Sequence, residues 1–298
     1  MAFQLTPEQE MIRLMARDFA KRELEPFAGT WDRDEVFPEA AIRKMGGLGL
    51  MGMMLPIEYG GAGAGAVSYS LALQEIAAAC ASTAVTMSVT NLSSDPILKF
   101  GSEEQKRKFL VPLARGEMLG AFAVTEPEAG SDPGSMTTRA EDRGDHYLVN
   151  GSKIFITNGS RADVIVLIVR TGSEKSNRGL SALLLTKGTP GFRIGRRDEK
   201  MGLRASDTVE LLFDDCRIPT ENLLAREGFG FRAAMAALDS GRIGIASQSL
   251  GIARACLQDA VLASKLPNQP FDDFFAVALA LCGGHHGDIL DLQHTLPL

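Results

Sequence analysis

Cysteine, histidine, tyrosine and tryptophan are all scarce in this sequence, whose 298 residues include four Cys, four His, three Tyr and one Trp. The cysteines lie far apart, and none belongs to a Cys-x-x-Cys pair, which favours free thiols in a reducing compartment over a disulfide framework. So few histidines leave little material for a histidine-based mechanism. Neither a Gly-x-Ser-x-Gly elbow nor a phosphate-binding P-loop occurs.

Long apolar runs and basic stretches are missing as well. No run reaches the roughly 18 residues that a membrane-spanning helix needs. The first ten residues lack the basic start and apolar core of a signal peptide. A formal net charge of −6 and a pI near 5.4 argue against nucleic-acid binding, which requires a basic face. We therefore expect a cytoplasmic protein with neither a membrane nor a nucleic-acid partner.

The first part of the chain, residues 1–118, has a helical pattern. Thr6, Pro7 and Gln9 form a capping box, in which a side-chain oxygen accepts a hydrogen bond from an unpaired amide at the start of a helix. Ser102 and Gln105 repeat this pattern. Residues 69–89 between them are rich in Ala, Leu and Ile, as in a helix that is buried on most sides. This region is expected to form an N-terminal helical domain.

Short runs with β propensity replace the helical pattern over residues 119–227. Because no helices separate these runs, they predict an antiparallel sheet or barrel and not a parallel βαβ sheet. Asn150-Gly151 and Pro190-Gly191 are expected to form turns between them. The strands are expected at residues 121–125, 147–149, 153–157, 164–169, 180–185 and 208–213.

Helical spacing returns over residues 228–265 and predicts one long helix. The last residues, 266–298, form an atypical tail that Pro and Gly interrupt repeatedly, with one apolar run at 274–281. Within the tail, Cys282, His285 and His286 could supply metal ligands. A structural zinc site needs four ligands at defined spacing, so no metal site is expected.

Two segments carry candidate functional residues. Residues 121–132, with the sequence AFAVTEPEAGSD, read as a strand that leads into a polar loop. Exposed amides and hydroxyls of this kind could bind the carbonyl edge of a heterocycle and a phosphate, or could simply form a hairpin loop. Asp239 and Arg242 lie three residues apart in the long helix, where such a pair is more often a salt bridge than a site.

Taken together, four segments resemble the acyl-CoA dehydrogenase family, and their order and separation agree with it over roughly residues 3–265. The last segment is most similar to the short-chain, butyryl-type members, with branched-chain members next. The segments are VTEPEAGSD (124–132), NGSKIFITNG (150–159), MGLRASDTVELLFDDCRIP (201–219) and LDSGRIGIASQSLGIA (238–253).

The resemblance implies an N-terminal helical domain, a central β-barrel and a C-terminal helical domain that is incomplete here, with FAD between the barrel and the C-terminal helices. It also implies two sets of binding residues. FAD would contact Phe122, Ala123, Val124, Thr125, Gly130, Ser131, Phe155, Ile156 and Thr157. The acyl-CoA substrate would contact Ser131, Asp239, Ser240, Gly241 and Arg242. Thr125 would bind the pyrimidine side of the flavin, and Thr157 would reach toward its N5 atom. Family members commonly carry Trp where this chain has Phe155.

The activity implied by the resemblance is the α,β-dehydrogenation of a short- or branched-chain acyl-CoA to a trans-2-enoyl-CoA. A base removes the α-proton while the β-hydride passes to flavin N5, and an electron-transfer flavoprotein accepts the electrons. The family forms homotetramers and usually takes its base from a Glu near the C-terminus. Nothing in residues 266–298 resembles that segment, and Gly241 stands where a minority of members carry Glu. We therefore expect a truncated or replaced C-terminal domain, with impaired activity or a non-catalytic remnant that binds acyl-CoA or a partner subunit.

Overall fold

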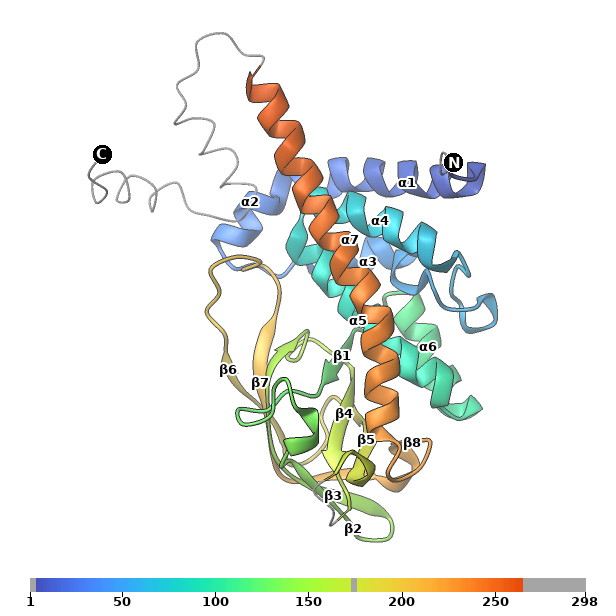
Figure 1. The fold of residues 1–298 in the computed structure, drawn as a ribbon, viewed down its shortest axis with the longest axis vertical. Helices are drawn as coiled ribbons and strands as arrows, with labels where there is room; N and C mark the ends of the chain where they lie inside the picture. Colours follow the sequence, from blue (N-terminus) through green and yellow to red (C-terminus); the bar gives the residue numbers. More distant parts are fainter. Residues whose placement is uncertain (1–3, 173–175, 265–298) are drawn as a thin grey trace, which may run out of the picture.

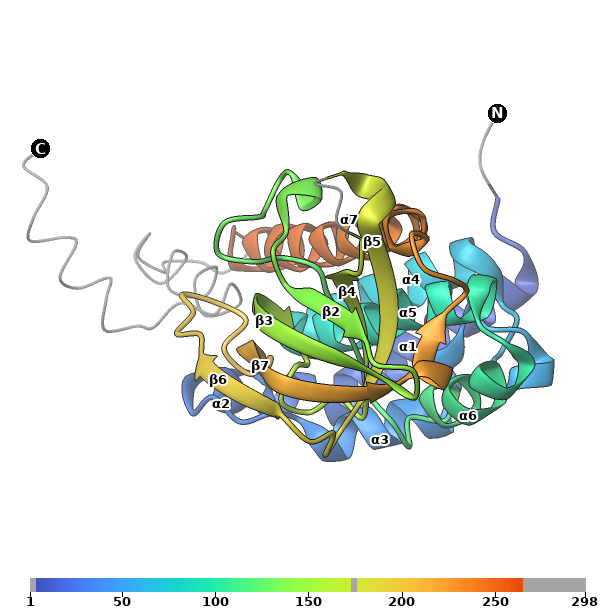
Figure 2. The same cartoon turned by 90° about the horizontal axis from the view of Figure 1, so that it is seen from below.

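A layer of helices packs against one face of a β-sheet, and a long helix crosses both (Figures 1 and 2). The computed structural model describes residues 4–172 and 176–264. The order confirms the predicted fold class, with N-terminal helices, a β module and a C-terminal helix. The helices of the first part are α1 (Pro7–Glu23), α2 (Glu25–Arg33), α3 (Glu39–Gly47), α4 (Gly65–Ala79), α5 (Ala81–Phe100) and α6 (Glu103–Ala114), with short 3-10 turns at Leu50–Gly52 and Ile57–Tyr59.

Both predicted capping boxes are confirmed. The Thr6 hydroxyl accepts a hydrogen bond from the amide of Gln9 at 3.2 Å, and the Gln9 side chain accepts one from the amide of Thr6 at 3.0 Å. Ser102 and Gln105 form the same pair of bonds at the start of α6. Each box satisfies two amides that have no partner within their helix.

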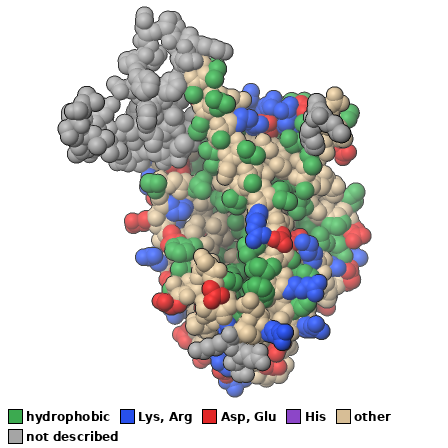
Figure 3. All heavy atoms as spheres, viewed as in Figure 1, with side chains coloured by type: hydrophobic (Ala, Val, Ile, Leu, Met, Phe, Trp, Pro, Cys, Tyr) green, Lys and Arg blue, Asp and Glu red, His purple; other side chains and the backbone are tan. Residues whose placement is uncertain are grey.

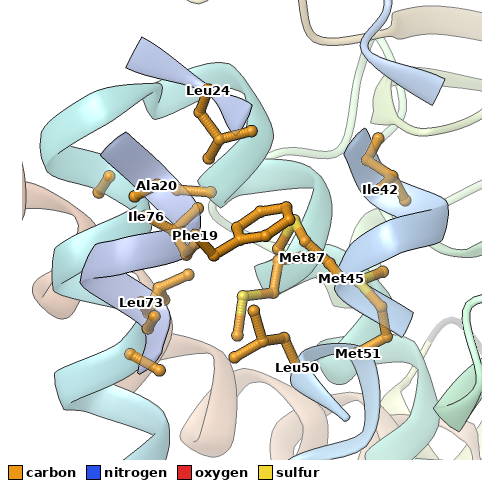
Figure 4. Packing of buried hydrophobic residues seen from close by; sticks show 14 of the residues in the cluster. Phe19, Ala20, Leu24, Ile42, Met45, Leu50, Met51, Leu73, Ile76 and Met87 are labelled. Atoms are coloured by element: carbon orange, nitrogen blue, oxygen red, sulfur yellow. The ribbon is translucent and has the colours of Figure 1, made fainter. Parts of the chain in front are cut away.

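The core of the helical part lies where α1, α3, α4 and α5 meet (Figure 4). Phe19 of α1 points into the centre, between Leu73 and Ile76 of α4 and Met87 of α5. Leu73, Ile76 and Met87 are completely buried. The predicted helix over residues 69–89 is in fact two helices, because Cys80 adopts an extended conformation between α4 and α5.

The β module is an eight-stranded sheet. Its hydrogen-bonded order is β6-β7-β3-β2-β4-β5-β8, and β1 pairs separately with β4. The strands are β1 (Gly120–Ala123), β2 (Arg139–Asp142), β3 (His146–Thr157), β4 (Val164–Arg170), β5 (Leu180–Thr186), β6 (Phe192–Arg197), β7 (Thr208–Pro219) and β8 (Leu223–Leu224).

The central strands β4 and β5 are buried on both faces, which explains their continuous apolar sequences. Val164, Val166 and Ile168 join a core shared with α5, α6 and α7. The alternate residues Ile165 and Leu167 join a second core, to which β1, β2, β3 and β7 contribute. One core therefore lies between sheet and helices, and the other is enclosed by the strands themselves.

The sheet departs from the expectations in two places. Most of its strand pairs are antiparallel, as expected, but β1 pairs in parallel with β4 from Gly120 to Ala123, and β2 pairs in parallel with β4 at Arg139 and Arg170. Asn150-Gly151 is not a turn between two strands but an irregularity inside β3, where the pairing with β7 shifts register. Asn150 exchanges hydrogen bonds with Asp215 of β7 there, which keeps the strand paired across the bulge. The strands β2, β6 and β8 were not expected.

The long helix α7 (Gly230–Ser264) approaches α4 and α5 closely through glycines. A Cβ atom at Gly251 would lie 2.4 Å from the carbonyl oxygen of Gln74, and one at Gly244 would lie 2.3 Å from the hydroxyl of Ser88. Its opposite face is exposed and apolar, and Figure 3 shows hydrophobic side chains gathered along it. Leu250 and Leu257 of this face are 58% and 65% exposed. The predicted tail 266–298 lies outside the described residues.

Candidate functional site

Strand β1 and the loop that follows it carry six of the nine residues expected to bind FAD. Phe122 and Ala123 belong to β1, with Ala123 fully buried, while Val124 and Thr125 continue the chain in a half-buried position. Gly130 and Ser131 lie further along the loop and are exposed. The segment is thus the predicted polar loop at the end of a strand.

The end of β3 presents the other expected flavin residues. Phe155 is an apolar side chain that is nevertheless 61% exposed, and its φ of 59° lies in the left-handed region that residues other than glycine rarely adopt. It sits inside an irregularity of the β3–β7 pairing, between Lys153 and Ile156. Ile156 points into the core, and Thr157 is half-buried. The bulge therefore turns an aromatic ring toward solvent.

The loop and the strand end lie side by side. The amide of Ile154 donates a hydrogen bond to the carbonyl oxygen of Thr125 at 3.0 Å, and Lys153 Nζ donates to the carbonyl oxygen of Val124 at 2.9 Å. Within the part of the chain that the structure describes, no hydrogen bond is formed by the hydroxyl of Thr125 or Thr157. The two expected halves of the flavin site are therefore adjacent, and two hydroxyls remain available for a ligand.

A buried ion pair, formed by residues that were not among the predicted site residues, joins these two segments. Lys153 Nζ lies 2.8 Å from Glu126 Oε1, with the side chains 0% and 2% exposed. Burial lowers the pKa of Lys153 to about 8, and the Glu126 charge offsets only part of that effect. Burial opposes ionisation of Glu126 too, but the charge of Lys153 and hydrogen bonds from Lys153, Thr137 and Thr138 hold the pKa of Glu126 below its usual value.

The return of the loop toward β2 is fixed by backbone contacts. The carboxylate of Asp132 accepts a hydrogen bond from the amide of Gly134 at 3.0 Å. Arg170, at the end of β4, donates to the carbonyl oxygens of Gly134 at 2.6 Å and Met136 at 3.1 Å. The guanidinium thus holds the far side of the loop against the sheet.

The expected acyl-CoA residues of α7 lie on two sides of the helix. Asp239 and Arg242 form an exposed ion pair with each other, as the salt-bridge interpretation of this pair predicted. The Ser240 hydroxyl donates to the carbonyl oxygen of Ala237 at 2.9 Å, and a Cβ atom at Gly241 would lie 2.8 Å from the Leu92 side chain. Among the described residues, no hydrogen bond or ion pair joins this turn to the loop or to β3.

A cavity of about 1130 Å³ lies elsewhere, between α1, α2, the α4–α5 junction and the last turns of α7. Its wall includes Glu75, which is 5% exposed and lies 3.1 Å from Arg17 of α1 and 2.8 Å from Arg254 of α7. None of the expected flavin or acyl-CoA residues lines it.

Neither a metal cluster nor a membrane span is found in the described residues. No three His, Cys, Asp or Glu side chains gather there as metal ligands would, and the candidate ligands Cys282, His285 and His286 lie outside these residues. Residues 4–172 and 176–264 include no helix that is long and apolar enough to cross a bilayer.

Comparison with known proteins gives two consecutive family matches. Residues 6–117 match the N-terminal domain of acyl-CoA dehydrogenases, and residues 121–216 match their middle domain. The short-chain specific acyl-CoA dehydrogenase of Clostridium acetobutylicum is 49% identical over 261 residues, which are 87% of this chain and 69% of that protein. The mitochondrial short-chain specific enzyme of Mus musculus is 49% identical over 259 residues, 87% of this chain and 63% of that protein.

A solved structure agrees with these matches. Butyryl-CoA dehydrogenase from Megasphaera elsdenii superimposes with a TM-score of 0.87 at 42% sequence identity, over 94% of this chain and 76% of that one. The chain therefore spans only about two thirds to three quarters of the length of these relatives.

Proposed function

The chain belongs to the acyl-CoA dehydrogenase family, a family of flavoprotein oxidoreductases of fatty acid β-oxidation, and on this premise we propose that it binds FAD and oxidises a short-chain acyl-CoA to the trans-2-enoyl-CoA. The site would lie between the loop after β1 and the end of β3. The observation that carries the proposal is the exposed Phe155 ring on the strand end that contacts Thr125, where the hydroxyls of Thr125 and Thr157 lack partners among the described residues.

The residues present fit a flavin. A ring that is 61% exposed, on a backbone held at positive φ, can stack on a planar heterocycle, which would cover its apolar face. The hydroxyls of Thr125 and Thr157 can donate to or accept from the edge of the same heterocycle. Bound FAD supplies the hydride acceptor, and the protein supplies orientation and electrostatics.

The acyl-CoA contacts remain part of the proposal. We assign Ser131 of the loop and the turn Asp239, Ser240, Gly241 and Arg242 to substrate binding. Arg242 carries a positive charge that can bind a CoA phosphate. Its ion pair with Asp239 is exposed, so a phosphate group can replace Asp239 as the partner of Arg242. The electrons would pass to an electron-transfer flavoprotein, and the assembled form would be a homotetramer.

An unactivated α-C–H is a weak acid, so removal of the α-proton needs a positioned base. The last Glu of the 298 residues is Glu227, and Gly241 has no side chain that could serve. Without a positioned base a rate is typically lower by about 10²–10⁴, so we propose slow turnover for these 298 residues taken by themselves. The alternative is a non-catalytic protein that binds acyl-CoA or a partner subunit.

The two candidates separate in one experiment. The purified chain is loaded with FAD, its absorbance near 450 nm is recorded, and butyryl-CoA is added without oxygen, with CoA alone as the control. Bleaching by butyryl-CoA and not by CoA supports the dehydrogenase. A yellow protein that butyryl-CoA leaves unchanged over hours supports a binding role, and a colourless protein contradicts FAD binding.

We also propose a cytoplasmic location, although the compared enzyme of Mus musculus is mitochondrial. Fractionation of cells that express the tagged chain tests it, and recovery with an organelle fraction would contradict it.

A further inference from the structure

The ion pair of Glu126 and Lys153 is buried at the point where the loop after β1 meets the end of β3. We propose that this pair positions the loop for cofactor binding, by fixing residues 124–126 against the segment 154–157. The inference rests on the proposed function, because it names what holds the two halves of that site together.

Lys153 binds the first part of the loop. Its ammonium group donates to the carbonyl oxygen of Val124 at 2.9 Å and to Glu126 Oε1 at 2.8 Å, and it lies 3.6 Å from the sulfur of Met136. Lys153 immediately precedes Ile154, whose amide binds Thr125. Three consecutive loop residues are therefore attached to two consecutive residues of β3.

Glu126 binds the returning part of the same loop. Its Oε2 accepts hydrogen bonds from the amide of Thr137 at 2.6 Å and the hydroxyl of Thr137 at 3.0 Å, and its Oε1 accepts one from the amide of Thr138 at 3.0 Å. The carboxylate thus closes the loop at its base. Between these points lie the exposed residues Pro127, Glu128 and Gly130, for which the described residues supply one long hydrogen bond, from the Ser135 hydroxyl to the carbonyl oxygen of Glu128 at 3.5 Å.

A buried ion pair of this kind fixes the positions of its partners more than it stabilises the fold. Two charges that are completely removed from water lose hydration energy that their attraction only partly restores, so a buried pair is weak support for a fold. Each oxygen of Glu126 and the ammonium of Lys153 instead selects particular backbone partners. With these partners fixed, the Thr125 hydroxyl keeps its place relative to Phe155 and Thr157 before any cofactor arrives, which lowers the ordering cost of binding.

The test compares Lys153→Met and Thr137→Val with the matched control Glu75→Gln. Lys153→Met removes the cation of the pair. Thr137→Val removes only the hydroxyl that donates to Glu126, and because Thr137 is exposed, we expect the Thr137→Val variant to fold even if Lys153→Met does not. Glu75 is an equally buried carboxylate paired with two cations, but its partners lie on α1 and α7. Global stability is measured by urea unfolding for every variant.

Two readouts follow loop position. The first is cleavage after the exposed Glu128 by a Glu-specific protease, with the exposed Glu104 and Glu117 as internal reference sites. The second is the FAD dissociation constant, from quenching of flavin fluorescence. We expect Lys153→Met to increase cleavage after Glu128 at least tenfold relative to the reference sites and to raise the FAD Kd at least tenfold. Thr137→Val should change both two- to fivefold, and Glu75→Gln should change neither.

Unchanged cleavage after Glu128 in both loop variants would overturn the inference, and so would cleavage that increases equally at all three sites, which indicates global unfolding. An FAD Kd that stays constant while the loop becomes cleavable would overturn it as well. A wild-type chain that resists cleavage but does not bind FAD would contradict the proposed function instead. Selective cleavage in the variants would then still support the loop-holding part of the inference.

Discussion

Replacing Phe155 by glycine separates the cofactor contact of this residue from its contribution to the fold. The left-handed backbone costs a residue other than glycine roughly 1–2 kcal/mol, which the substitution relieves. Glycine also increases the conformational entropy of the unfolded chain, which offsets about 0.5–1 kcal/mol of this gain in stability. Because the ring is 61% exposed, its buried remainder contributes only about 1 kcal/mol. The free energy of unfolding without FAD should therefore fall by no more than about 1 kcal/mol.

The effect on FAD binding should be larger. Covering the exposed part of the ring contributes about 1–2 kcal/mol by area, and an aromatic stack adds about 0.5–1.5 kcal/mol. Phe155→Gly should therefore raise the FAD Kd about 10- to 300-fold in a fluorescence-quenching titration. Phe155→Trp offers a larger ring and should bind FAD at least as tightly as the wild-type chain.

Ala225→Gly is the matched control for this experiment. Ala225 also has a positive φ, of 61°, but it is exposed and lies after β8. Its substitution should increase stability by about 0.5 kcal/mol and leave the FAD Kd unchanged. If Phe155→Gly binds FAD as tightly as the wild-type chain, or if Ala225→Gly weakens binding equally, the stacking role of Phe155 is refuted.

The remaining predictions concern stability. Gly251→Ala should destabilise the chain by about 1–2 kcal/mol in urea unfolding, because the new Cβ would lie 2.4 Å from a backbone oxygen. Gly29→Ala has nothing within 4 Å of its new Cβ and should stabilise the chain by about 0.5–1 kcal/mol. Equal effects of the two substitutions would contradict the close packing of α7. Leu73→Ala should cost about 2–5 kcal/mol, and Leu250→Ala, at a position 58% exposed, less than about 0.5 kcal/mol by the same measurement. The pKa of Glu126 is lower in the folded chain than its unfolded value of about 4.5, so ionised Glu126 stabilises the folded state above pH 4.5. This stabilisation is lost as the pH falls below 4.5. The urea midpoint should therefore decrease less steeply below pH 4.5 in Glu126→Gln than in the wild-type chain.

The starts of two helices could be predicted from side chains that lie close together in the sequence. Thr6 and Ser102 each precede a glutamine at the spacing that a capping box requires, and both boxes form. The strand runs at 164–169 and 180–185 were also recognisable, because β-branched and aliphatic residues follow one another there without a break. The order of helices, sheet and helix followed from these patterns.

Long-range contacts explain what the sequence did not show. Asn150-Gly151 has the composition of a turn, but its pairing with β7, including the bonds to Asp215, makes it a bulge. Pairing in parallel with β4 depends on strands that are distant in sequence, so no local pattern reveals it. One sequence feature did indicate the buried ion pair, because Lys153 is an even number of residues from the buried Tyr147 and Val149 and so falls on the same face of an alternating strand. A lysine on a buried face requires a partner of opposite charge, but the sequence does not identify Glu126 as that partner.

A crystal structure of the chain with FAD tests the central claim most directly. We predict that the isoalloxazine ring lies against Phe155, within hydrogen-bonding distance of the hydroxyls of Thr125 and Thr157. A flavin bound in the cavity beside Glu75 and Arg254, with Phe155 still exposed to solvent, would contradict the account.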